Sequence, residues 1–588
     1  MEPPTPTIGE VVESLLVVGG GIAGMTAALE AAEAGHDVVL VEKQPALGGW
    51  LAQFHKLYPT RSPYRDLWTM DLDAKIRVLN EHPRIKVYTG AEIKNISGEP
   101  GTFQVTVQQN GNAVEFQTGA VVMATGWQPQ ESGLEKLGYG KHANVITNVQ
   151  LEAMAKEGKI TRPSDGKPAR RVAFLQRPGL SQEQKFSFGC NVVDMATLKQ
   201  AIYIRELDPA SDVYIIYEDM VALGTYEAFY RRVQEEPGVY FTKGDVVGVS
   251  EDGKGNLLLE LEHSLLGERV SVPVDMVVLA TGMVPSTADS PVLNLMYRQG
   301  PGLPKAKFGF SDSNFICFPY ETSRTGLYAA GSVREPMDVR AAIDDATGAA
   351  LKAIQSLQLV SKGEATHPRS GDLSLPITRL QGCTKCGRCS EECPFSAIEV
   401  EESGYPTLNP DRCRRCGICM GACPVQVISF EDYSVGQLSA MVKAIQFSED
   451  EEKPRILALA CENDAYPAFD MAGINRMAYD ASVRVIPLRC LGSLNVAVVA
   501  DAISRGVDGV MLIGCKSGED YQCHFIQGSE LAGRRMENVK ETLGRLMIEP
   551  ERVKPLELEI TEYDLIPAMV SEFVDEIKRM GPNPYKGF

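Results

Sequence analysis

The most restrictive feature of this 588-residue chain is a pair of cysteine runs with identical spacing. The runs are Cys383-x2-Cys386-x2-Cys389-x3-Cys393 and Cys413-x2-Cys416-x2-Cys419-x3-Cys423, each followed by proline. This spacing is typical of bacterial two-cluster ferredoxins, in which the fourth cysteine of each run binds the other run's cluster. We therefore predict one 4Fe-4S cluster on Cys383, Cys386, Cys389 and Cys423, and a second on Cys413, Cys416, Cys419 and Cys393. Zinc is the alternative, and the repeated four-cysteine pattern disfavours it.

A glycine cluster near the N-terminus predicts a dinucleotide site. An apolar strand over residues 15–18 leads into Gly19-Gly-Gly21-Ile22-Ala23-Gly24 and an Ala-rich helix, and Glu42 and Lys43 follow the next strand. In this fingerprint Gly19 permits the tight turn, Gly21 lets a pyrophosphate approach the backbone, and Gly24 allows close helix packing. We expect Glu42 to accept a hydrogen bond from a ribose hydroxyl.

Three further motifs indicate which dinucleotide binds. Gly48-Gly49 and the two turns Ala124-Thr125-Gly126 and Ala280-Thr281-Gly282 resemble those of two-dinucleotide-fold flavoproteins of the thioredoxin reductase type, which implies FAD. The strand expected over 172–175 runs into Gln176-Arg-Pro-Gly179 instead of a second glycine fingerprint, so an NAD(P)H site is not expected. Gly331 resembles the late flavin-contacting glycine of that group. Asp338 is either a ribityl contact or a plain surface carboxylate.

Four more cysteines lie near the C-terminus. Cys461, Cys490 and Cys515 each come directly after an apolar segment predicted as a strand, over 456–460, 485–489 and 510–514, and Cys523 follows eight residues after Cys515. Because the carboxyl ends of parallel strands meet at one edge, we expect these thiols to converge. They predict a 2Fe-2S or zinc site, and the alternative is that some are small buried apolar side chains.

The motifs and composition changes divide the chain into an α/β multidomain arrangement. We expect a loose tail at 1–13, a flavin-binding domain at 14–150 and 285–360, an inserted degenerate NAD-like domain at 151–284, a linker at 361–375, the ferredoxin insert at 376–432 and a small α/β domain at 433–588. Its last strand is expected near 556–561.

Charge and hydropathy exclude several classes of protein. The formal net charge is −19, and basic residues are not concentrated as nucleic-acid binding requires. No stretch approaches the roughly 18 apolar residues of a membrane span. Fourteen cysteines without an export signal indicate metal binding in a reducing, cytoplasmic compartment, peripheral to the membrane only through partner subunits.

The order of these parts resembles the HdrA subunit of heterodisulfide reductase fused to an MvhD-like domain. The flavin part carries this resemblance in 48–60, 144–147 and 226–230, and the last domain carries it in 514–525 and 534–535. Segments 460–467 and 518–525 look most like QmoB of the quinone-interacting membrane-bound oxidoreductase complex. Typical HdrA proteins have cysteines after the Tyr-Pro-Thr motif, where this chain has Arg61-Ser-Pro-Tyr-Arg65, so the cluster near the flavin is expected to be absent.

The resemblance implies a relay in which the flavin exchanges two electrons with one-electron carriers, with or without bifurcation. It implies three partners, which are a QmoA-like (HdrA-like) flavoprotein, adenylylsulfate reductase and a QmoC-like quinone-reactive membrane subunit. The alternatives are a soluble heterodisulfide reductase or hydrogenase-type complex, and an NAD(P)H-dependent protein of the glutamate-synthase small-subunit type. An assembly scaffold is a third possibility from another class. Lys56 lies in the matched motif, where an ammonium near flavin N5 would stabilise reduced flavin, or it is a solvated surface lysine.

Overall fold

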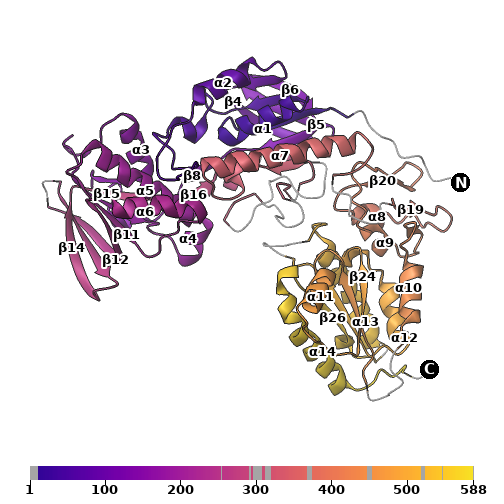
Figure 1. Ribbon diagram of the computed structural model, residues 1–588. Helices are drawn as coiled ribbons and strands as arrows, with labels where there is room; N and C mark the ends of the chain where they lie inside the picture. The colour runs from indigo at the N-terminus through magenta and orange to yellow at the C-terminus, as the bar shows by residue number, and fades with distance from the viewer. Residues whose placement is uncertain are drawn as a thin grey trace.

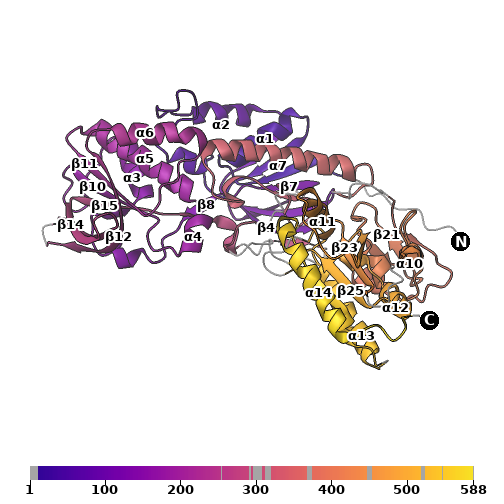
Figure 2. The ribbon, with the colours of Figure 1, turned by 60° about the horizontal axis from the view of Figure 1, so that its bottom comes forward.

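The computed structural model describes residues 11–252, 255–289, 293–295, 308–311, 319–322, 324–366, 374–446, 453–517, 523–545 and 547–586. Two α/β units form one end of the molecule, and the ferredoxin module and the last α/β domain form the other (Figure 1). Helix α7 (Val339–Val360) runs from the junction of the first two units towards the ferredoxin module in both views (Figures 1 and 2).

The first unit is built on a five-stranded parallel sheet in the order β18-β7-β1-β2-β3. Its strands are β1 (Ser14–Val18), β2 (Asp37–Val41), β3 (Ile85–Tyr88), β7 (Ala120–Met123) and β18 (Leu327–Ala329). Alternate side chains of a strand point to opposite faces. Leu15 and Val17 pack under α1 (Ile22–Glu33) and α7, whereas Leu16 packs against a second sheet. Burial on both faces explains why these strands are continuously apolar.

That second sheet has the order β17-β4-β5-β6 and covers the face opposite the helices. Its strands are β17 (Leu293–Leu295), β4 (Ala91–Gly98), β5 (Phe103–Gln109) and β6 (Asn112–Thr118), and α2 (Leu72–Glu81) precedes β3. Residues 290–292, 296–307, 312–318 and 323 of the segment predicted at 285–360 lie outside the described residues.

The second unit is a seven-stranded sheet in the order β14-β13-β12-β11-β10-β15-β9. Its elements are β9 (Val145–Thr147), α3 (Asn148–Lys156), β10 (Arg171–Gln176), α4 (Gln182–Ser187), α5 (Cys190–Leu207), β11 (Asp212–Tyr217), α6 (Glu227–Glu235), β12 (Val239–Glu251), β13 (Leu257–His263), β14 (Glu268–Val274) and β15 (Met276–Ala280). Strand β9 pairs with β15, so this sheet includes residues before the expected boundary at 151. An antiparallel ribbon of β8 (Trp127–Pro129) and β16 (Met283–Pro285) connects the two units.

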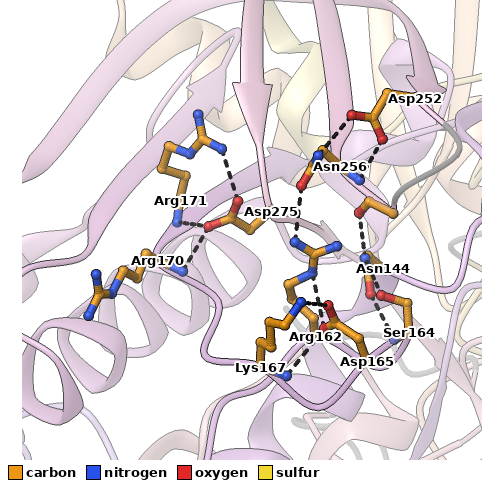
Figure 3. A network of polar contacts seen from close by, with 11 residues as sticks. Asn144, Arg162, Ser164, Asp165, Lys167, Arg170, Arg171, Asp252, Asn256 and Asp275 are labelled. Atoms are coloured by element: carbon orange, nitrogen blue, oxygen red, sulfur yellow. Dashed lines mark hydrogen bonds and ion pairs between the residues drawn. The ribbon is translucent and has the colours of Figure 1, made fainter.

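A polar network fastens the β12–β13 hairpin to the loop before β10 (Figure 3). The Asn144 amide donates to Gly255 O at 2.7 Å and to Ser164 Oγ at 2.9 Å. Arg162 donates to Asn256 Oδ1 at 3.0 Å, and Asp275 accepts from the backbone N of Arg171 at 2.9 Å. This network gives Asn144, the first residue of the 144–147 motif, a structural role.

The ferredoxin module consists of two short repeats. Each repeat contributes strands and one short helix: β19 (Ile377–Thr378), α8 (Arg388–Glu391), β20 (Ile398–Val400), β21 (Pro406–Leu408), α9 (Ile418–Ala422) and β22 (Ile428–Ser429). Left-handed φ values recur at an offset of 30 residues, at Lys385 and Arg415 (58° and 59°) and at Ser396 and Gln426 (48° and 54°). The backbone itself is therefore repeated. Residues 367–373 of the expected linker lie outside the described residues.

The last domain has a four-stranded parallel sheet in the order β24-β23-β25-β26. Its elements are α10 (Val435–Ala444), β23 (Ile456–Cys461), α11 (Ala465–Ile474), β24 (Val483–Leu488), α12 (Val496–Ser504), β25 (Gly509–Gly514), α13 (Gly528–Arg545), β26 (Val553–Glu557) and α14 (Ile566–Met580). The strand expected near 556–561 was misplaced. It is β26, and residues 560–565 form a 3-10 helix instead. Among the described helices, none is long and apolar enough to cross a bilayer.

Candidate functional site

A cavity of about 920 Å³ opens where β1 and β7 meet the second unit. Twelve of the predicted flavin-site residues line it: Gly19, Gly21, Ile22, Ala23, Glu42, Lys43, Gly49, Ala124, Thr125, Gly126, Thr281 and Asp338. Gly24, Gly48, Ala280, Gly282 and Gly331 lie behind this wall. The structure thus gathers residues from five separate parts of the chain around one space.

The turn between β1 and α1 is shaped for a close-approaching ligand. A side chain at Gly19 (φ 109°) would lie 2.3 Å from Ala124 O, and one at Gly24 would lie 1.7 Å from Gly19 O. At Gly21 a Cβ would meet nothing within 4 Å, so its position faces open space. The turn therefore fits a dinucleotide pyrophosphate at the N-terminus of α1.

Acidic side chains brace this site as well as lining it. Glu42 Oε2 accepts from Gly20 N and Oε1 accepts from Gln44 N, both at 2.6 Å. Asp338 caps α7 by accepting from Ala341 N at 2.8 Å, and its other oxygen accepts from the Tyr226 hydroxyl at 2.5 Å. Behind the wall, Gly331 N donates to Asp345 Oδ2 at 2.7 Å.

Lys56, predicted either to approach the flavin or to be a surface lysine, is not among the residues that line the cavity. Its ammonium pairs with Glu206 at 2.7 Å. Two lysines line the cavity, the exposed Lys43 and the buried Lys199 on α5, which is 4% exposed. Its Nζ donates to Lys56 O at 2.9 Å and pairs with Glu152 Oε1 at 3.0 Å. Sequence reasoning missed Lys199, although Lys199 and Gln200 interrupt the apolar cavity face of α5 formed by Val192, Val193 and Ala196.

Glu152 is the centre of this buried network. It accepts from His55 N at 2.9 Å, from the Gln200 amide at 2.8 Å and from the Tyr203 hydroxyl at 3.1 Å. Burial raises the pKa of Tyr203, and the charge of Glu152 raises it further. Burial lowers the pKa of Lys199, opposed by Glu152. The network ties loop 53–58 of the first unit to α3 and α5 of the second.

The corresponding turn of the second unit, after β10, is filled by protein. The Arg177 guanidinium is 5% exposed, donates to Asp219 O at 2.5 Å and lies 3.7 Å from Asp194 Oδ1. Asp194 is fully buried, and burial raises its pKa to about 7, opposed by Arg177. A charged pair occupies the position where a second fingerprint would cradle a nucleotide.

The eight ferredoxin cysteines fall into two groups that cross between the runs. The pKa of Cys389 is raised to about 11, first by burial and then by the nearby thiols of Cys386, Cys423 and Cys383. Burial raises the pKa of Cys419, and the thiols of Cys416, Cys413 and Cys393 raise it further, followed by Cys389 of the first group. In both repeats a backbone N–H four residues on donates to the fourth cysteine, from Ala397 to Cys393 and from Val427 to Cys423.

These groups match the predicted ligand sets, and the backbone donors suit thiolates bound to iron-sulfur clusters. The two groups differ in exposure. Cys386 is exposed and Cys383 half-buried, whereas Cys393, Cys413, Cys416 and Cys419 are all buried. Because burial keeps such thiols protonated, cluster binding must displace protons.

The four C-terminal cysteines also converge. Cys461 Sγ lies 3.5 Å from Cys515 Sγ, and Cys523 contacts both Cys490 and Cys515. A Cβ at Gly528 would lie 2.3 Å from Cys490 Sγ and 3.3 Å from Cys523 Sγ, so glycine leaves room beside them. Two thiol pairs in one buried space fit a 2Fe-2S cluster, which has two thiolates on each iron. No described group of His, Cys, Asp or Glu has the arrangement of a single-ion site.

The C-terminal thiols adjoin the buried ferredoxin group. Cys490 shares an apolar cluster with Cys393, Cys413 and Cys416, and the Cys523 thiol contributes to the raised pKa of Cys416 after burial and the nearer Cys393. Arg535 on α13 joins Glu392 and also donates to Gly492 O at 2.6 Å. The ferredoxin module and the last domain are thus packed as one body around these cysteines.

Three segments of the chain match known protein-family models. Residues 13–161 match pyridine nucleotide-disulphide oxidoreductase, 382–427 match the 4Fe-4S dicluster domain, and 456–581 match the delta subunit of methyl-viologen-reducing hydrogenase. Among solved structures, T. acidophilum thioredoxin reductase is 19% identical and covers 58% of this chain and 97% of its own, with a TM-score of 0.42.

Two of the curated relatives span almost the whole chain, and a third spans 70% of it. The A subunit of the ferredoxin/F420H2-dependent CoB-CoM heterodisulfide reductase of Methanosarcina acetivorans is 30% identical over 97% of this chain and 80% of its own length. The A subunit of the ferredoxin:CoB-CoM heterodisulfide reductase of Methanosarcina mazei is 29% identical over 98% and 81%. That of the H2:CoB-CoM heterodisulfide,ferredoxin reductase of Methanothermobacter marburgensis is 29% identical over 70% and 72%.

A flavoprotein fold of the pyridine nucleotide-disulphide oxidoreductase family, a 4Fe-4S dicluster domain and an MvhD-like α/β domain in one chain define an oxidoreductase subunit with several redox centres. The sequence identity and coverage of its relatives also determine the family. The chain belongs to the HdrA family of heterodisulfide reductases.

Proposed function

We propose that this chain is the flavin and iron-sulfur electron-transfer subunit of a heterodisulfide-reductase-type complex. The observation that carries the proposal is the packing of three four-cysteine groups into one body joined to a flavoprotein unit. Bound FAD supplies conversion between two-electron and one-electron transfer. The glycine turn and Lys43 would hold its dinucleotide part, and Lys199 would place a positive charge in the same cavity.

The relay order follows from burial. The exposed cysteine group, with Cys386 at the surface, suits exchange with an external carrier. The buried group lies between it and the C-terminal thiols, which we propose bind a 2Fe-2S cluster through Cys461, Cys490, Cys515 and Cys523. The last domain then serves as a second docking or entry point for a partner subunit.

Cofactor analysis after anaerobic purification tests this proposal. We expect one FAD and about ten irons per chain, from two 4Fe-4S clusters and one 2Fe-2S cluster. Cys490→Ser should remove the 2Fe-2S signal from the EPR spectrum and leave both 4Fe-4S signals, whereas Cys419→Ser should remove one 4Fe-4S signal and leave the 2Fe-2S signal. A chain without FAD, or with clusters that dithionite does not reduce, would contradict the electron-transfer role and favour a scaffold.

The filled turn after β10 argues against the NAD(P)H-dependent alternative. Arg177 and Asp194 occupy the position that a nicotinamide dinucleotide would need. We expect the oxidised-flavin absorbance band, at about 450 nm, to stay constant when NADH or NADPH is added. Rapid bleaching would restore the glutamate-synthase-type alternative.

The quinone-linked complex is a narrower proposal within the same family. It rests on the likeness of segments 460–467 and 518–525 to QmoB, and residues 518–522 lie outside the described residues. The relatives named above are heterodisulfide reductase subunits, so they favour the heterodisulfide-reductase-type complex. Co-purification from the native source decides between them. A second flavoprotein, adenylylsulfate reductase and a haem-bearing membrane subunit would favour the quinone-linked complex.

A further inference from the structure

Three arginines of the second cysteine run bind the flavoprotein unit. Arg412 pairs with Glu99, Arg414 Nη2 with Glu321 Oε1 at 2.7 Å, and Arg415 Nη2 with Glu364 Oε1 at 3.8 Å. The equivalent positions of the first run, 30 residues earlier, are Gly382, Thr384 and Lys385. Lys385 Nζ donates to Ser403 O at 2.8 Å, within the ferredoxin module itself. Of the two runs, the second is therefore the one that guanidinium groups fasten to the flavoprotein unit, as far as the described residues show.

The Arg414–Glu321 pair is the most deeply buried of the three. Its side chains are 4% and 1% exposed. Arg414 Nη2 also donates to Thr325 Oγ1 at 2.6 Å, and its guanidinium lies 4.9 Å from the Phe395 ring centroid. Phe395 follows the Cys393-Pro394 step, and Arg414 follows Cys413. One guanidinium thus contacts both loops that carry the buried cysteine group.

Contacts continue from Glu321 to the wall of the flavin cavity. The neighbouring Tyr320 ring lies 4.8 Å from the Arg334 guanidinium, and Arg334 pairs with Asp345. Asp345 accepts from Gly331 N, and Ala330 and Ser332 on either side of Gly331 line the cavity. The ion pair therefore stands at one end of a packed polar chain between the two redox regions.

We propose that Arg414 and Glu321 act in opposite directions on the reduction potential of the cluster bound by Cys393, Cys413, Cys416 and Cys419, and that the intact ion pair holds these two effects in balance. This inference rests on the proposed function. Reduction adds negative charge to a cluster, so a nearby positive charge favours the reduced state and a negative charge disfavours it. At this burial the solvent screens neither charge strongly, and each partner limits the effect of the other.

Single and double neutralisations separate the two charges. In the anaerobically purified full chain, Glu321→Gln should shift the midpoint potential of the buried cluster to more positive values, because the charge of Arg414 is then uncompensated. Arg414→Gln should shift it to more negative values. The double variant should lie close to wild type. The potential of the cluster on Cys383, Cys386, Cys389 and Cys423 should change less in every variant.

EPR-monitored redox titration of each variant, with iron and FAD analysis, measures these shifts. Arg545→Gln is the matched control, because that guanidinium pairs with Glu541 at a surface where both side chains are more than half exposed. If Arg414→Gln loses iron, Glu321→Gln and the charge-conserving Arg414→Lys carry the test, and Arg414→Lys should stay near the wild-type potential.

The outcomes distinguish the two proposals. Wild-type protein without the two 4Fe-4S signals would overturn the proposed function. Wild-type protein with both signals, and neutralised variants with full iron content and unchanged potentials, would overturn this inference alone. Shifts of the same sign in Glu321→Gln and Arg414→Gln would also overturn it. Such shifts would mean that a general loosening of the interface, and not the two charges, changes the potential.

Discussion

The two turns that follow β1 and β10 occupy equivalent places in two α/β units, yet one is hollow and the other is filled. After β1, Gly21 faces open cavity and the nearby side chains only border it. After β10, the Arg177 guanidinium and the Asp194 carboxylate are packed into the protein. A glycine turn leaves the positive N-terminal end of the helix free to bind a phosphate. In the second unit, the Asp194 carboxylate supplies the negative charge from within the protein, and it pairs with Arg177. The same architecture has thus kept one ligand site and closed the other.

Breaking the buried pair should have the largest effect on stability. Arg177→Ala leaves the Asp194 carboxylate buried without its partner, so we expect the free energy of unfolding of the second unit to fall by about 3–5 kcal/mol. Urea unfolding followed by circular dichroism measures it. The double variant with Asp194→Ala should recover part of the loss, and a double variant no better than Arg177→Ala would show that packing, not charge, holds the turn.

Filling the hollow turn should act on the flavin as well as on the fold. Gly24→Ala places a Cβ against Gly19 O, and we expect a loss of about 1–3 kcal/mol together with loss of bound flavin. Gly21→Ala is the matched control for stability, because its Cβ enters open space. It should keep the melting temperature of the flavin-free protein and still lower the flavin-to-protein ratio. Equal melting losses for both variants would contradict the geometry.

The raised pKa of Asp194 predicts that the free energy of unfolding depends on pH through this one carboxyl group. Its folded-state pKa of about 7 is above the unfolded value of 3.8, so between these values the unfolded state binds fewer protons. Stability should therefore fall as pH rises from about 4 to 7, by up to about 1.4 kcal/mol per pH unit from this group. Asp194→Asn should flatten this part of the stability profile, measured by urea unfolding at several pH values.

Replacing the buried cavity lysine should change the flavin more than the fold. In Lys199→Met, Glu152 keeps donors from His55 N, Gln200 and Tyr203, so we expect a stability loss of about 1 kcal/mol. Removal of a positive charge from the cavity should make the flavin midpoint potential more negative. Spectroelectrochemical titration measures this, and an unchanged potential would place the flavin ring away from Lys199.

Replacing Lys56, which is partly exposed, should have the smallest effect on stability and on the flavin potential. Lys56 is paired with Glu206, and both side chains are partly exposed to solvent. Lys56→Gln should change stability by about 0–1 kcal/mol and leave the flavin potential at its wild-type value. A shift comparable to that of Lys199→Met would restore Lys56 to the flavin site.

The sequence predicted those features that depend on local geometry. The Gly19–Gly24 turn and the crossed cysteine groups follow from steric and ligand rules with little freedom, and the structure arranges both as expected. The sequence left Lys56 open between a flavin contact and a surface lysine, because a motif does not show that the backbone of Lys56 joins the cavity network while its ammonium pairs with Glu206. Lys199 was missed because no local motif marks a charged side chain that turns inward. Strand β26 was misplaced because edge strands carry a weaker apolar pattern.

The depth of the C-terminal cysteines has a consequence for how the protein is made. Cys461, Cys490 and Cys515 are each 1% exposed, and Cys523 is 6% exposed. A cluster-delivering protein exchanges thiolate ligands by direct contact, and thiols inside a finished domain offer no such contact. For the 2Fe-2S cluster proposed above, iron would therefore have to reach these residues before Cys523 and Gly528 close over them. Biogenesis would then be limited by metal delivery during folding, and a chain that folds in its absence would be locked out of maturation.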